Sequence, residues 1–273
     1  MNSDAKLELL KDILKKMESV VIAFSGGVDS TFLSSVANEV LGQKALTVFG
    51  HSSVCPPGDL EEALYLAQKL GFRFRIVETR ELDDPKFVAN TPDRCYYCKQ
   101  ELFGNLKNIA SSEGIKWTLD GSNYDDVKDY RPGRKAGKEL GVRSPLCEVQ
   151  LTKEEIRQLS LKWGLATWDK PASPCLASRI PYGIAVSEDI LRKIAQGEEH
   201  LRKLGIRQLR LRHHGDIARI EVEAKDMALL LDENIRSKIV KNIKDLGYSY
   251  VTLDLNGYHP GSLNIKINRI EGE

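Results

Sequence analysis

The stretch V-I-A-F-S-G-G-V-D-S, Val21 to Ser30, decides the fold, because an apolar run ends there in two glycines between hydroxyl and carboxylate side chains. Val20 to Phe24 is predicted to be a short buried strand. From Thr31 to Leu41 apolar residues recur at helical spacing, and Gly42 is placed to end that helix. The glycines therefore join a strand to a helix N-terminus. Bare backbone there can turn several N–H groups toward one point, where the helix dipole adds partial positive charge, so an anion is the expected occupant.

The residue types in this loop distinguish between classes of phosphate-binding motif. A Walker-type loop needs G-x-x-x-x-G-K-[S/T], but this loop has no lysine, and G-x-G-x-x-G is absent as well. The loop instead resembles the S-G-G-x-D-S signature of the PP-loop ATP pyrophosphatases, which hold ATP by its pyrophosphate end and cleave between the α and β phosphates. The resemblance implies that ATP is bound by Ser25, Gly26, Gly27, Asp29 and Ser30. Asp29 is a candidate catalytic residue and Mg²⁺ ligand, directly or through water. The alternative is a tight turn in which Ser30 or Asp29 caps the helix.

Segments of strand length and helix length alternate through the first part of the chain. Further strands are predicted at 45–49, 74–77 and 117–120, and helices at 59–70, 96–110 and 152–163. The last of these helices opens with the capping box T-K-E-E. This alternation predicts an α/β fold with a parallel sheet and helices on both faces, in a domain spanning residues 1–180.

The segment K-P-A-S-P-C-L-A-S-R-I-P-Y-G, residues 170–183, contains three prolines and cannot be one helix or a central strand. It is predicted to be a loop or hinge. Beyond it we expect a helix at 188–204, a hairpin around Gly215, one or two helices over 225–246, a strand at 248–255 and a ragged tail after Pro260. These elements predict a smaller α+β domain over residues 181–273, to which we assign substrate binding and the contacts of a homo-oligomer.

Charge and composition restrict the partners. The chain has 40 Lys and Arg against 39 Asp and Glu, so no overall field attracts nucleic acid or an anionic membrane. It has neither the apolar core of a signal peptide nor a run of about 18 apolar residues, so we expect a soluble cytoplasmic protein. Five cysteines are too few for a disulfide scaffold. In a reducing compartment, clustered cysteines indicate metal binding or catalysis.

Three cysteines are candidates for that chemistry. Cys95 and Cys98 form C-Y-Y-C, and this spacing puts both sulfurs on one face if a helix begins there. The pair could be half of a zinc site or a redox dithiol, although the other zinc ligands and a thioredoxin context are lacking. Together with Cys175 it could bind three irons of a 4Fe-4S cluster, leaving the fourth iron open to an external sulfur atom. Three buried, inert thiols remain the alternative. Cys55 and Cys147 are interpreted as structural.

Four stretches together resemble a known family: S-G-G-V-D-S, D-G-S-N-Y-D-D-V-K-D-Y-R-P-G at 120–133, G-V-R-S-P-L at 141–146 and P-A-S-P-C-L-A-S-R-I-P-Y-G at 171–183. They are similar to the LarE family, PP-loop sulfur transferases of nickel-pincer nucleotide biosynthesis, over most of the chain. The resemblance implies that the enzyme adenylates a carboxylate of a pyridinium-dicarboxylate mononucleotide and releases pyrophosphate. Sulfur then replaces the activated oxygen, with AMP as the leaving group.

The family has two branches that differ in their source of sulfur. In one, a lone cysteine at the position of Cys175 gives up its own sulfur and becomes dehydroalanine. This chain also has Cys95 and Cys98, so it resembles the three-cysteine branch. That resemblance implies a 4Fe-4S cluster held by all three cysteines, a hydrosulfide on its open iron and an external sulfur source. We therefore expect catalytic turnover rather than self-sacrifice.

Charged residues in two further segments are candidates for ligand binding. Asp120, Gly121, Asp125 and Asp126 follow the strand at 117–120, at the edge where α/β sheets place ligands. They are expected to order magnesium or the nucleotide, with a solvated turn as the alternative. Arg179, four residues after Cys175, is also assigned to substrate binding.

In the predicted hairpin, Arg210 and Arg212 alternate with leucines and share one strand face, where two guanidinium groups could hold a mononucleotide phosphate. The alternative is an exposed, charged sheet edge. Glu199 is a weaker candidate, because a solvated helix face is the commoner explanation for such a residue.

Other functions remain possible. An iron-sulfur tRNA thiolase would use the same cysteines, but it needs a basic face for phosphates, and the balanced charge makes a nucleic-acid partner unexpected. An amidating ligase would have no function for Cys95, Cys98 and Cys175. A nucleotide sensor would bind ATP without releasing pyrophosphate.

Overall fold

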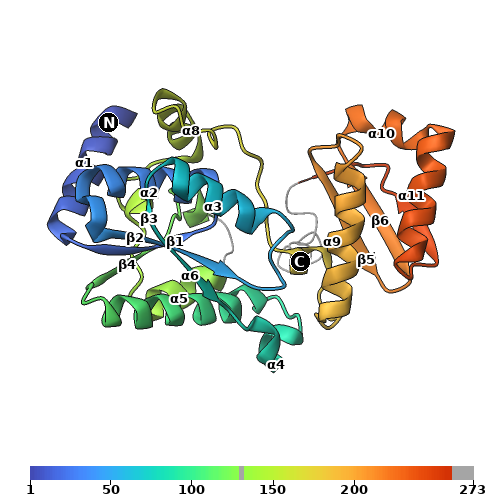
Figure 1. Cartoon of the computed structure of the whole chain (residues 1–273), viewed down its shortest axis with the longest axis horizontal. Coiled ribbons are helices and arrows are strands. Elements are labelled where there is room, and N and C mark those ends of the chain that lie inside the picture. Colours follow the sequence, from blue (N-terminus) through green and yellow to red (C-terminus); the bar gives the residue numbers. More distant parts are fainter. Residues whose placement is uncertain (129–131, 260–273) are drawn as a thin grey trace. The chain divides into compact units, whose positions relative to one another are not determined.

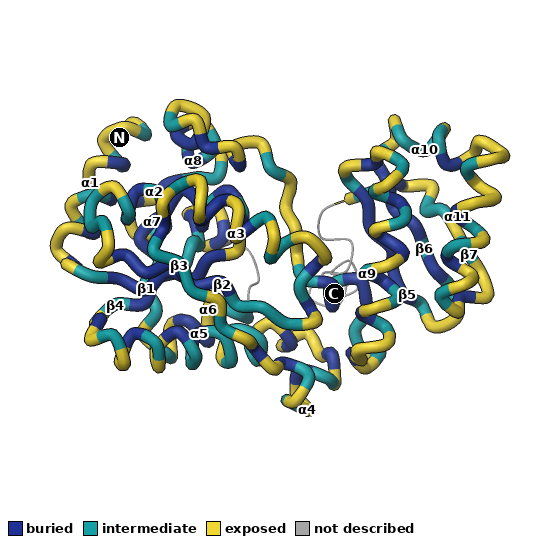
Figure 2. Tube along the Cα trace, viewed as in Figure 1, coloured by how far each residue is buried: buried dark blue, intermediate teal, exposed yellow. Residues whose placement is uncertain are grey.

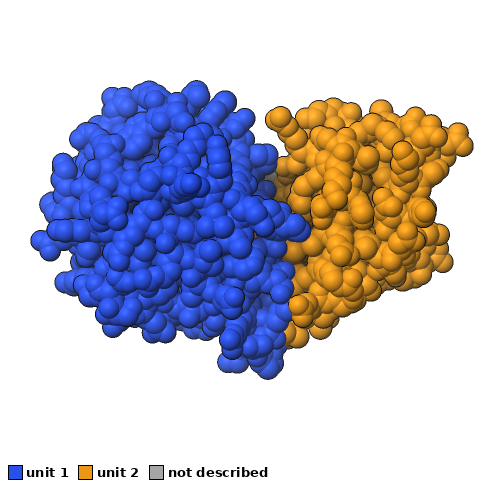
Figure 3. Space-filling view, viewed as in Figure 1, with its two compact units in different colours: residues 1–87, 91–173 blue, residues 88–90, 174–273 orange. Residues whose placement is uncertain are grey.

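The computed structural model describes residues 1–128 and 132–259. The chain divides into two compact units, of which unit 1 comprises Met1–Phe87 and Thr91–Ser173. Unit 2 comprises Val88–Asn90 and the chain from Pro174 onward (Figure 3). Each unit is described by itself below. Residues 129–131, which belong to the stretch at 120–133, and the tail after Pro260 lie outside the described residues.

The centre of unit 1 is a four-stranded sheet in which every strand is parallel to its neighbours. The strands are β1 (Val20–Phe24), β2 (Ala45–His51), β3 (Arg73–Glu78) and β4 (Trp117–Leu119), in the order β3-β2-β1-β4. All five residues of β1 are buried, because the strand has neighbours on both sides and helices on both faces (Figure 2). In this order β2 and β3 lie on one side of β1 and β4 lies on the other, so the strand order reverses at β1. Open α/β sheets bind ligands at the carboxyl ends of the strands at such a point.

Helices cover both faces of this sheet (Figure 1). On one face, α1 (Ser3–Met17), α2 (Val28–Leu41) and α8 (Lys153–Lys162) pack with Val20 and Ile22 of β1. On the other face, α5 (Arg94–Ser112) packs against Val21 and Ala23. Alternate residues of one strand thus enter opposite cores, as the period of a strand requires. The predicted α/β fold class with a doubly covered parallel sheet is confirmed.

Several shorter elements complete unit 1: α3 (Asp59–Lys69), α6 (Pro132–Glu139), α7 (Pro145–Glu148) and the 3-10 turns η1 (Gly42–Lys44), η2 (Glu81–Asp83) and η3 (Asp125–Lys128). Helix α4 (Pro85–Val88) belongs to unit 1 except for its last residue. The predicted capping box is present, because Thr152 and Glu155 each accept a hydrogen bond from the other's backbone N–H. Helix α2 begins at Val28, earlier than the predicted Thr31, because apolar periodicity does not detect the polar first turn.

Unit 2 contains a three-stranded sheet in the order β5-β6-β7, with three helices. Strands β5 (Leu209–His214) and β6 (Ile217–Val222) form the predicted hairpin, and β7 (Tyr250–Leu253) pairs in parallel with β6. The helices are α9 (Glu188–Arg202), α10 (Ala224–Leu231) and α11 (Glu233–Asp245), and a 3-10 turn, η4 (Leu176–Arg179), precedes them. Helices α10 and α11 are separate because Asp232 is extended and its side chain caps α11. Among the described residues of both units, none forms a helix long and apolar enough to cross a membrane.

Candidate active site

The glycine loop connects the carboxyl end of β1 to the N-terminus of α2. Gly26 has φ +66°, in the left-handed region where glycine is favoured, and Gly27 is the N-cap of α2. The Ser30 hydroxyl lies inside the loop: it accepts a hydrogen bond from the Ser25 N–H at 3.2 Å and lies 3.1 Å from the Ser25 hydroxyl. The alternative in which Ser30 or Asp29 caps the helix is therefore wrong. The first-turn N–H groups of α2, which have no partner within the helix, point out of its N-terminus.

The loop after β4 packs directly against the glycine loop. A Cβ atom on Gly121 would lie only 3.0 Å from the backbone nitrogen of Ser30, which is closer than Cβ atoms ordinarily approach a backbone. Asp120 fixes the conformation of this loop by accepting hydrogen bonds from the Ser122 N–H at 3.1 Å and the Ser144 hydroxyl at 2.6 Å. The two predicted ligand-binding segments of unit 1 are thus neighbours in space.

Asp29 lies in the first turn of α2 with its carboxylate partly paired. Its Oδ2 accepts a hydrogen bond from the Lys153 ammonium at 2.7 Å, whereas Oδ1 is buried and has no hydrogen-bond partner among the described residues. Burial raises the pKa of Asp29, Lys153 and the side chain of Asn123 lower it, and the nearby charge of Asp126 raises it, so the pKa lies above its ordinary value. A buried carboxylate with a raised pKa and an open oxygen is stabilised by a cation, so Asp29 fits Mg²⁺.

The other two predicted carboxylates organise the surrounding backbone. Asp125 accepts a hydrogen bond from the Lys153 N–H at 2.8 Å, at the start of α8. Asp126 is buried and accepts one from the Asn123 N–H at 3.0 Å. The solvated-turn alternative therefore does not apply to Asp126, because 8% of its surface is exposed. Lys153 therefore contacts both carboxylates: its backbone N–H donates to Asp125 and its ammonium donates to Asp29.

Two lysines at the glycine loop were missed by the sequence analysis. Lys153 is one of them. The other, Lys170, donates to the Gly26 carbonyl oxygen at 3.0 Å and lies 2.8 Å from a carboxylate oxygen of Glu62. Both lysines follow the loop by more than 120 positions in the sequence, and no local pattern connects them to it.

Cys95 and Cys98 lie in the first two turns of α5, in the same unit as the glycine loop. Neither forms a disulfide, and Cys95 is exposed. The Cys98 thiol lies 3.8 Å from Oε1 of the buried Glu81, to which it donates. A helix N-terminus stabilises thiolates, which are the form of cysteine that binds metals. The predicted helical spacing of the pair is confirmed.

Cys55 and Cys147 have surroundings consistent with a structural role. The Cys55 thiol donates to the Gly50 carbonyl at 3.6 Å and packs against the core beneath α3. Burial raises the pKa of the Cys147 thiol, which keeps it protonated and unreactive.

Cys175 and Arg179 belong to unit 2, where Cys175 directly precedes η4. The Arg179 side chain is fully buried, and its guanidinium donates to the Cys175 carbonyl at 3.0 Å. The same guanidinium forms an ion pair with Glu198. Arg179 therefore shapes the backbone around Cys175. Among the described residues, no three or more His, Cys, Asp or Glu side chains are arranged to hold a metal ion.

The two arginines of β5 are buried, and the exposed-edge alternative is wrong. Only 5% of Arg210 and 6% of Arg212 is exposed. Arg212 forms a two-pronged ion pair with Glu221, at 3.0 and 2.8 Å, and donates to the Ser178 carbonyl at 2.8 Å. Burial and the positive charge of Arg179 lower the pKa of Arg210 to about 10. A buried cation of this kind is stabilised by an anion.

Glu198 carries the buried carboxylate of α9, whereas Glu199 lies on a solvated helix face, as the alternative for Glu199 expects. Glu199 is paired with Lys203 on the exposed side of the helix. The apolar positions Leu191, Ile194 and Leu201 could have indicated this, because helical spacing puts position 198 on their face.

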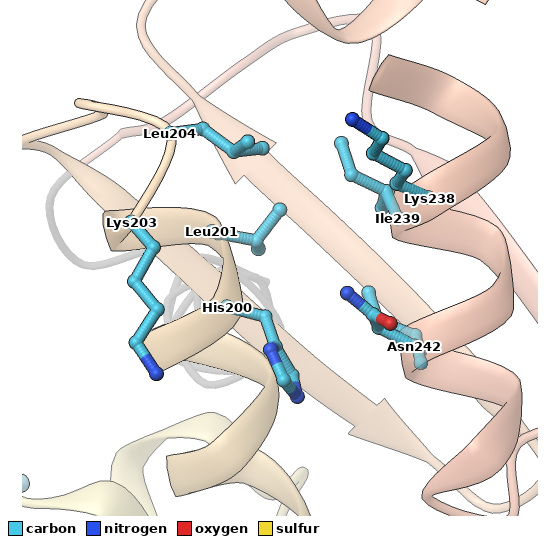
Figure 4. Close-up of a pocket in the computed structure, with 8 residues that line it drawn as sticks. His200, Leu201, Lys203, Leu204, Lys238, Ile239 and Asn242 are labelled. Atoms are coloured by element: carbon cyan, nitrogen blue, oxygen red, sulfur yellow. The ribbon is translucent and has the colours of Figure 1, made fainter. Parts of the chain in front are cut away.

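A shallow groove between α9 and α11 in unit 2 is lined mainly by apolar atoms (Figure 4). Its lining residues are His200, Leu201, Lys203, Leu204, Lys238, Ile239, Asn242 and Ile243. None of the predicted site residues lines it, so the groove is separate from the candidate site.

Comparisons with known proteins agree with this description. Residues 4–94, which include the glycine loop, match the NAD synthase family. Over its whole length the chain is similar to the pyridinium-3,5-bisthiocarboxylic acid mononucleotide synthase of Lactiplantibacillus plantarum, with 37% identity over 94% of this chain and 93% of the relative. It is 42% identical to an uncharacterised protein of Synechocystis sp., over 96% of this chain and 97% of the relative. An uncharacterised protein of Methanocaldococcus jannaschii is 30% identical, over 93% and 97%.

The parallel sheet, the glycine loop and the Asp29 carboxylate define an ATP-using enzyme with the PP-loop ATP pyrophosphatase fold. Similarity over nearly the full length to a synthase that makes a thiocarboxylate places it among the sulfurtransferases. The chain belongs to the LarE family of PP-loop sulfurtransferases.

Proposed function

We propose that this protein inserts sulfur into a carboxylate of a pyridinium-dicarboxylate mononucleotide at the expense of ATP. The carboxylate attacks the α phosphate, and pyrophosphate leaves with the bonding electron pair. Hydrosulfide then attacks the acyl adenylate, AMP leaves, and a thiocarboxylate and one proton are produced. The single observation that carries the proposal is the position of Cys95 and Cys98, both free of disulfides and three positions apart at the start of α5, in the unit that holds the glycine loop.

The glycine loop and its neighbours provide the adenylation half of the reaction. The N–H groups of the first turn of α2 bind the pyrophosphate end of ATP, because they lack helical partners and lie at the positive end of the helix dipole. Asp29 would hold Mg²⁺, because its Oδ1 is buried and accepts no hydrogen bond from the described residues. Gly121 lets the loop after β4 approach closely enough to close one side of the phosphate site.

The three cysteines provide the sulfur-transfer half. Cys95 and Cys98 suit an iron–sulfur cluster because they form no disulfide and lie about one helical turn apart near a helix N-terminus. Cys175 would be the third ligand, on a backbone that Arg179 holds. A bound 4Fe-4S cluster would supply the nucleophilic sulfur as hydrosulfide, renewed from an external sulfur source. Because such a cluster needs its cysteines as thiolates, which a reducing compartment maintains, we assign the protein to the cytoplasm.

Unit 2 is proposed to bind the mononucleotide. Arg210 is the preferred ligand for its phosphate, because it is a buried guanidinium with a lowered pKa that an anion would stabilise. Arg212 and Arg179 each share a two-pronged pair with a glutamate, so they support this region and orient it. We also assign homo-oligomer contacts to unit 2.

A second candidate uses the same fold with a different sulfur source. Cys175 alone could surrender its sulfur and become dehydroalanine after one turnover. The presence of Cys95 and Cys98 favours the catalytic form. An iron-sulfur tRNA thiolase is disfavoured by the formal net charge of +1, because RNA binding relies on basic surfaces.

Anaerobic purification tests the cluster directly. The wild-type protein should be brown, and Cys95→Ala, Cys98→Ala and Cys175→Ala should each lose the colour and the bound iron. Cys55→Ala and Cys147→Ala are the matched controls and should keep both. A wild-type protein without iron after anaerobic reconstitution would refute the cluster.

Product formation tests the reaction itself. With ATP, sulfide and the pyridinium dicarboxylate mononucleotide, the reconstituted enzyme should make several thiocarboxylates per chain and leave Cys175 intact by mass spectrometry. A single turnover that leaves residue 175 lighter by about 34 Da would establish the sacrificial route instead, because conversion of cysteine to dehydroalanine removes one H₂S.

A further inference from the structure

Two lysines reach the glycine loop from distant parts of unit 1, although the loop itself contains none. Lys153, the first residue of α8, donates to Asp29 Oδ2 at 2.7 Å. Lys170 donates to the Gly26 carbonyl at 3.0 Å. A phosphate site usually contains a lysine or arginine in addition to backbone N–H groups. These two residues are therefore the candidates for that cation.

The contacts of the two lysines differ. Lys170 lies between the Gly26 carbonyl and the Glu62 carboxylate, with 18% of its side chain exposed. It holds the loop in place, and moving it would break both contacts. Lys153 contacts Asp29 through its ammonium, and 38% of its side chain is exposed. Its four-carbon stem can turn without disturbing α8, because a backbone hydrogen bond from its N–H to Asp125 fixes the start of that helix.

The electrostatics of Asp29 explain why Lys153 occupies this position without nucleotide. The Asp29 carboxylate is largely buried and lies near the negative charge of Asp126, which makes an uncompensated charge costly. The ammonium of Lys153 compensates it. A divalent cation carries twice that charge and prefers carboxylate oxygens, so Mg²⁺ arriving with ATP competes for the same group. The displaced ammonium would remain next to the first turn of α2, where the phosphates are proposed to bind.

We propose that Lys153 is a phosphate-binding residue that neutralises Asp29 in the nucleotide-free enzyme and moves onto the pyrophosphate group when Mg²⁺ and ATP bind. This inference rests on the proposed phosphate role of the glycine loop, and is independent of the sulfur-transfer half. The lysine that a Walker-type loop carries within its own sequence is here supplied by the first turn of α8.

Two binding measurements on Lys153→Met test the exchange. Loss of the ammonium should strengthen metal binding at Asp29 and weaken pyrophosphate binding at the glycine loop. Without nucleotide, Mn²⁺ binding followed by electron paramagnetic resonance should tighten about threefold, since the competing ammonium is gone. Binding of magnesium pyrophosphate, followed by calorimetry, should weaken about tenfold, since a charged phosphate contact is lost. Lys153→Arg keeps the charge and should restore wild-type values for both.

Lys6→Met is the matched control. Lys6 forms an ion pair of the same 2.7 Å length with Glu155, in the same turn of α8, and does not contact Asp29. Removing it should change neither measurement. If Lys153→Met does not fold, Lys153→Gln, which retains a polar side chain, is measured in its place. Pyrophosphate affinity equal to that of the wild type in whichever variant folds overturns the proposal.

The same data separate this inference from the proposed function. A wild-type enzyme that binds magnesium pyrophosphate but forms no thiocarboxylate refutes the sulfur chemistry and leaves the role of Lys153 intact. A wild-type enzyme that does not bind magnesium pyrophosphate refutes both the role of Lys153 and the proposed phosphate role of the loop.

Discussion

Arg179 and Glu198 form a two-pronged ion pair inside unit 2, with Nε–Oε1 at 2.8 Å and Nη2–Oε2 at 3.0 Å. Only 1% and 0% of their side chains are exposed. Arg179 also donates to the Cys175 carbonyl at 3.0 Å, and Glu198 accepts from the Leu211 N–H at 3.1 Å. The pair therefore connects the segment that carries Cys175 to helix α9 and strand β5. Its contribution can be measured because the neighbouring residue of α9 provides a control.

Glu198→Ala should strongly destabilise unit 2, because it leaves the Arg179 guanidinium buried without its carboxylate. Breaking a buried pair in this way costs about 3–5 kcal/mol. Glu199→Ala removes an exposed carboxylate from the same helix turn and should change the free energy of unfolding by less than about 0.5 kcal/mol. Amide hydrogen exchange of unit 2 peptides measures both changes without requiring the whole chain to unfold in one step. Equal effects from the two variants would show that the pair does not hold this region together.

The difference between these two glutamates shows what sequence reasoning could and could not provide. The alternation of strand-length and helix-length segments was sufficient to predict the parallel sheet. The glycines after Phe24 were sufficient to predict the loop at its edge and the helix that follows, because these features depend on local patterns. The face occupied by Glu198 was available from helical spacing but was overlooked. The positions of Lys153 and Lys170 were not available, because they result from chain folding between segments more than 120 residues apart.

Burial of the β5 arginines could not be predicted from β5 alone for a related reason. Alternating charged residues on a strand usually indicate a solvated face. In this protein the charges are compensated across the hairpin, since Glu221 of β6 pairs with Arg212. The partner lies in a different strand, and the register that brings them together is set by the whole sheet.

Gly121→Ala should weaken ATP binding by on the order of tenfold, because the new Cβ would lie 3.0 Å from the Ser30 nitrogen and displace the phosphate loop. The matched control is Gly104→Ala in α5, where a Cβ would meet no atom within 4 Å. That replacement should leave ATP affinity unchanged and stabilise the helix by up to about 1 kcal/mol. Calorimetric titration with ATP and Mg²⁺ compares the two. Wild-type affinity in Gly121→Ala would show that the two loops need not approach so closely.

Unit 2 should lose stability as the pH falls below about 6.5, because of His213. Burial lowers the pKa of this histidine below its ordinary value of 6.5, so the folded state keeps it neutral while the unfolded chain takes up a proton. Stability is therefore complete above pH 6.5 and decreases as the pH falls toward the folded pKa. Burial also lowers the pKa of His214, which adds to the same trend.

The variant His213→Gln isolates this effect, since an amide can still hydrogen-bond to Tyr248, whose hydroxyl lies 3.1 Å from Nδ1 of His213. Urea unfolding of unit 2, followed by hydrogen exchange between pH 7.5 and 5.5, should show a shallower pH dependence in this variant. His259→Gln, which removes an exposed histidine, should retain the wild-type slope. If His213→Gln also retained the wild-type slope, proton uptake by His213 would not account for the acid sensitivity.

Asn90 determines the conformation of the P-Y-G turn that follows η4. It is buried, has φ +52°, and donates from Nδ2 to the carbonyls of Pro181 at 2.9 Å and Ile184 at 2.7 Å. Its own carbonyl accepts from the Gly183 N–H at 3.1 Å. One side chain thus satisfies carbonyl groups of a loop about ninety positions later in the chain.

Asn90→Ala should destabilise this turn by about 3 kcal/mol, because buried carbonyls lose their donor and alanine is strained at a positive φ. Asn90→Gly removes the same donor without the strain, so it should cost about 1 kcal/mol less. Hydrogen exchange of residues 181–186 measures both, and faster exchange should reach the backbone around Cys175 because η4 lies between them. Since both variants lack the same donor, identical protection in both would show that the strain of alanine at this positive φ contributes no net effect. Protection equal to the wild type in Asn90→Ala would show that the turn keeps its conformation without Asn90.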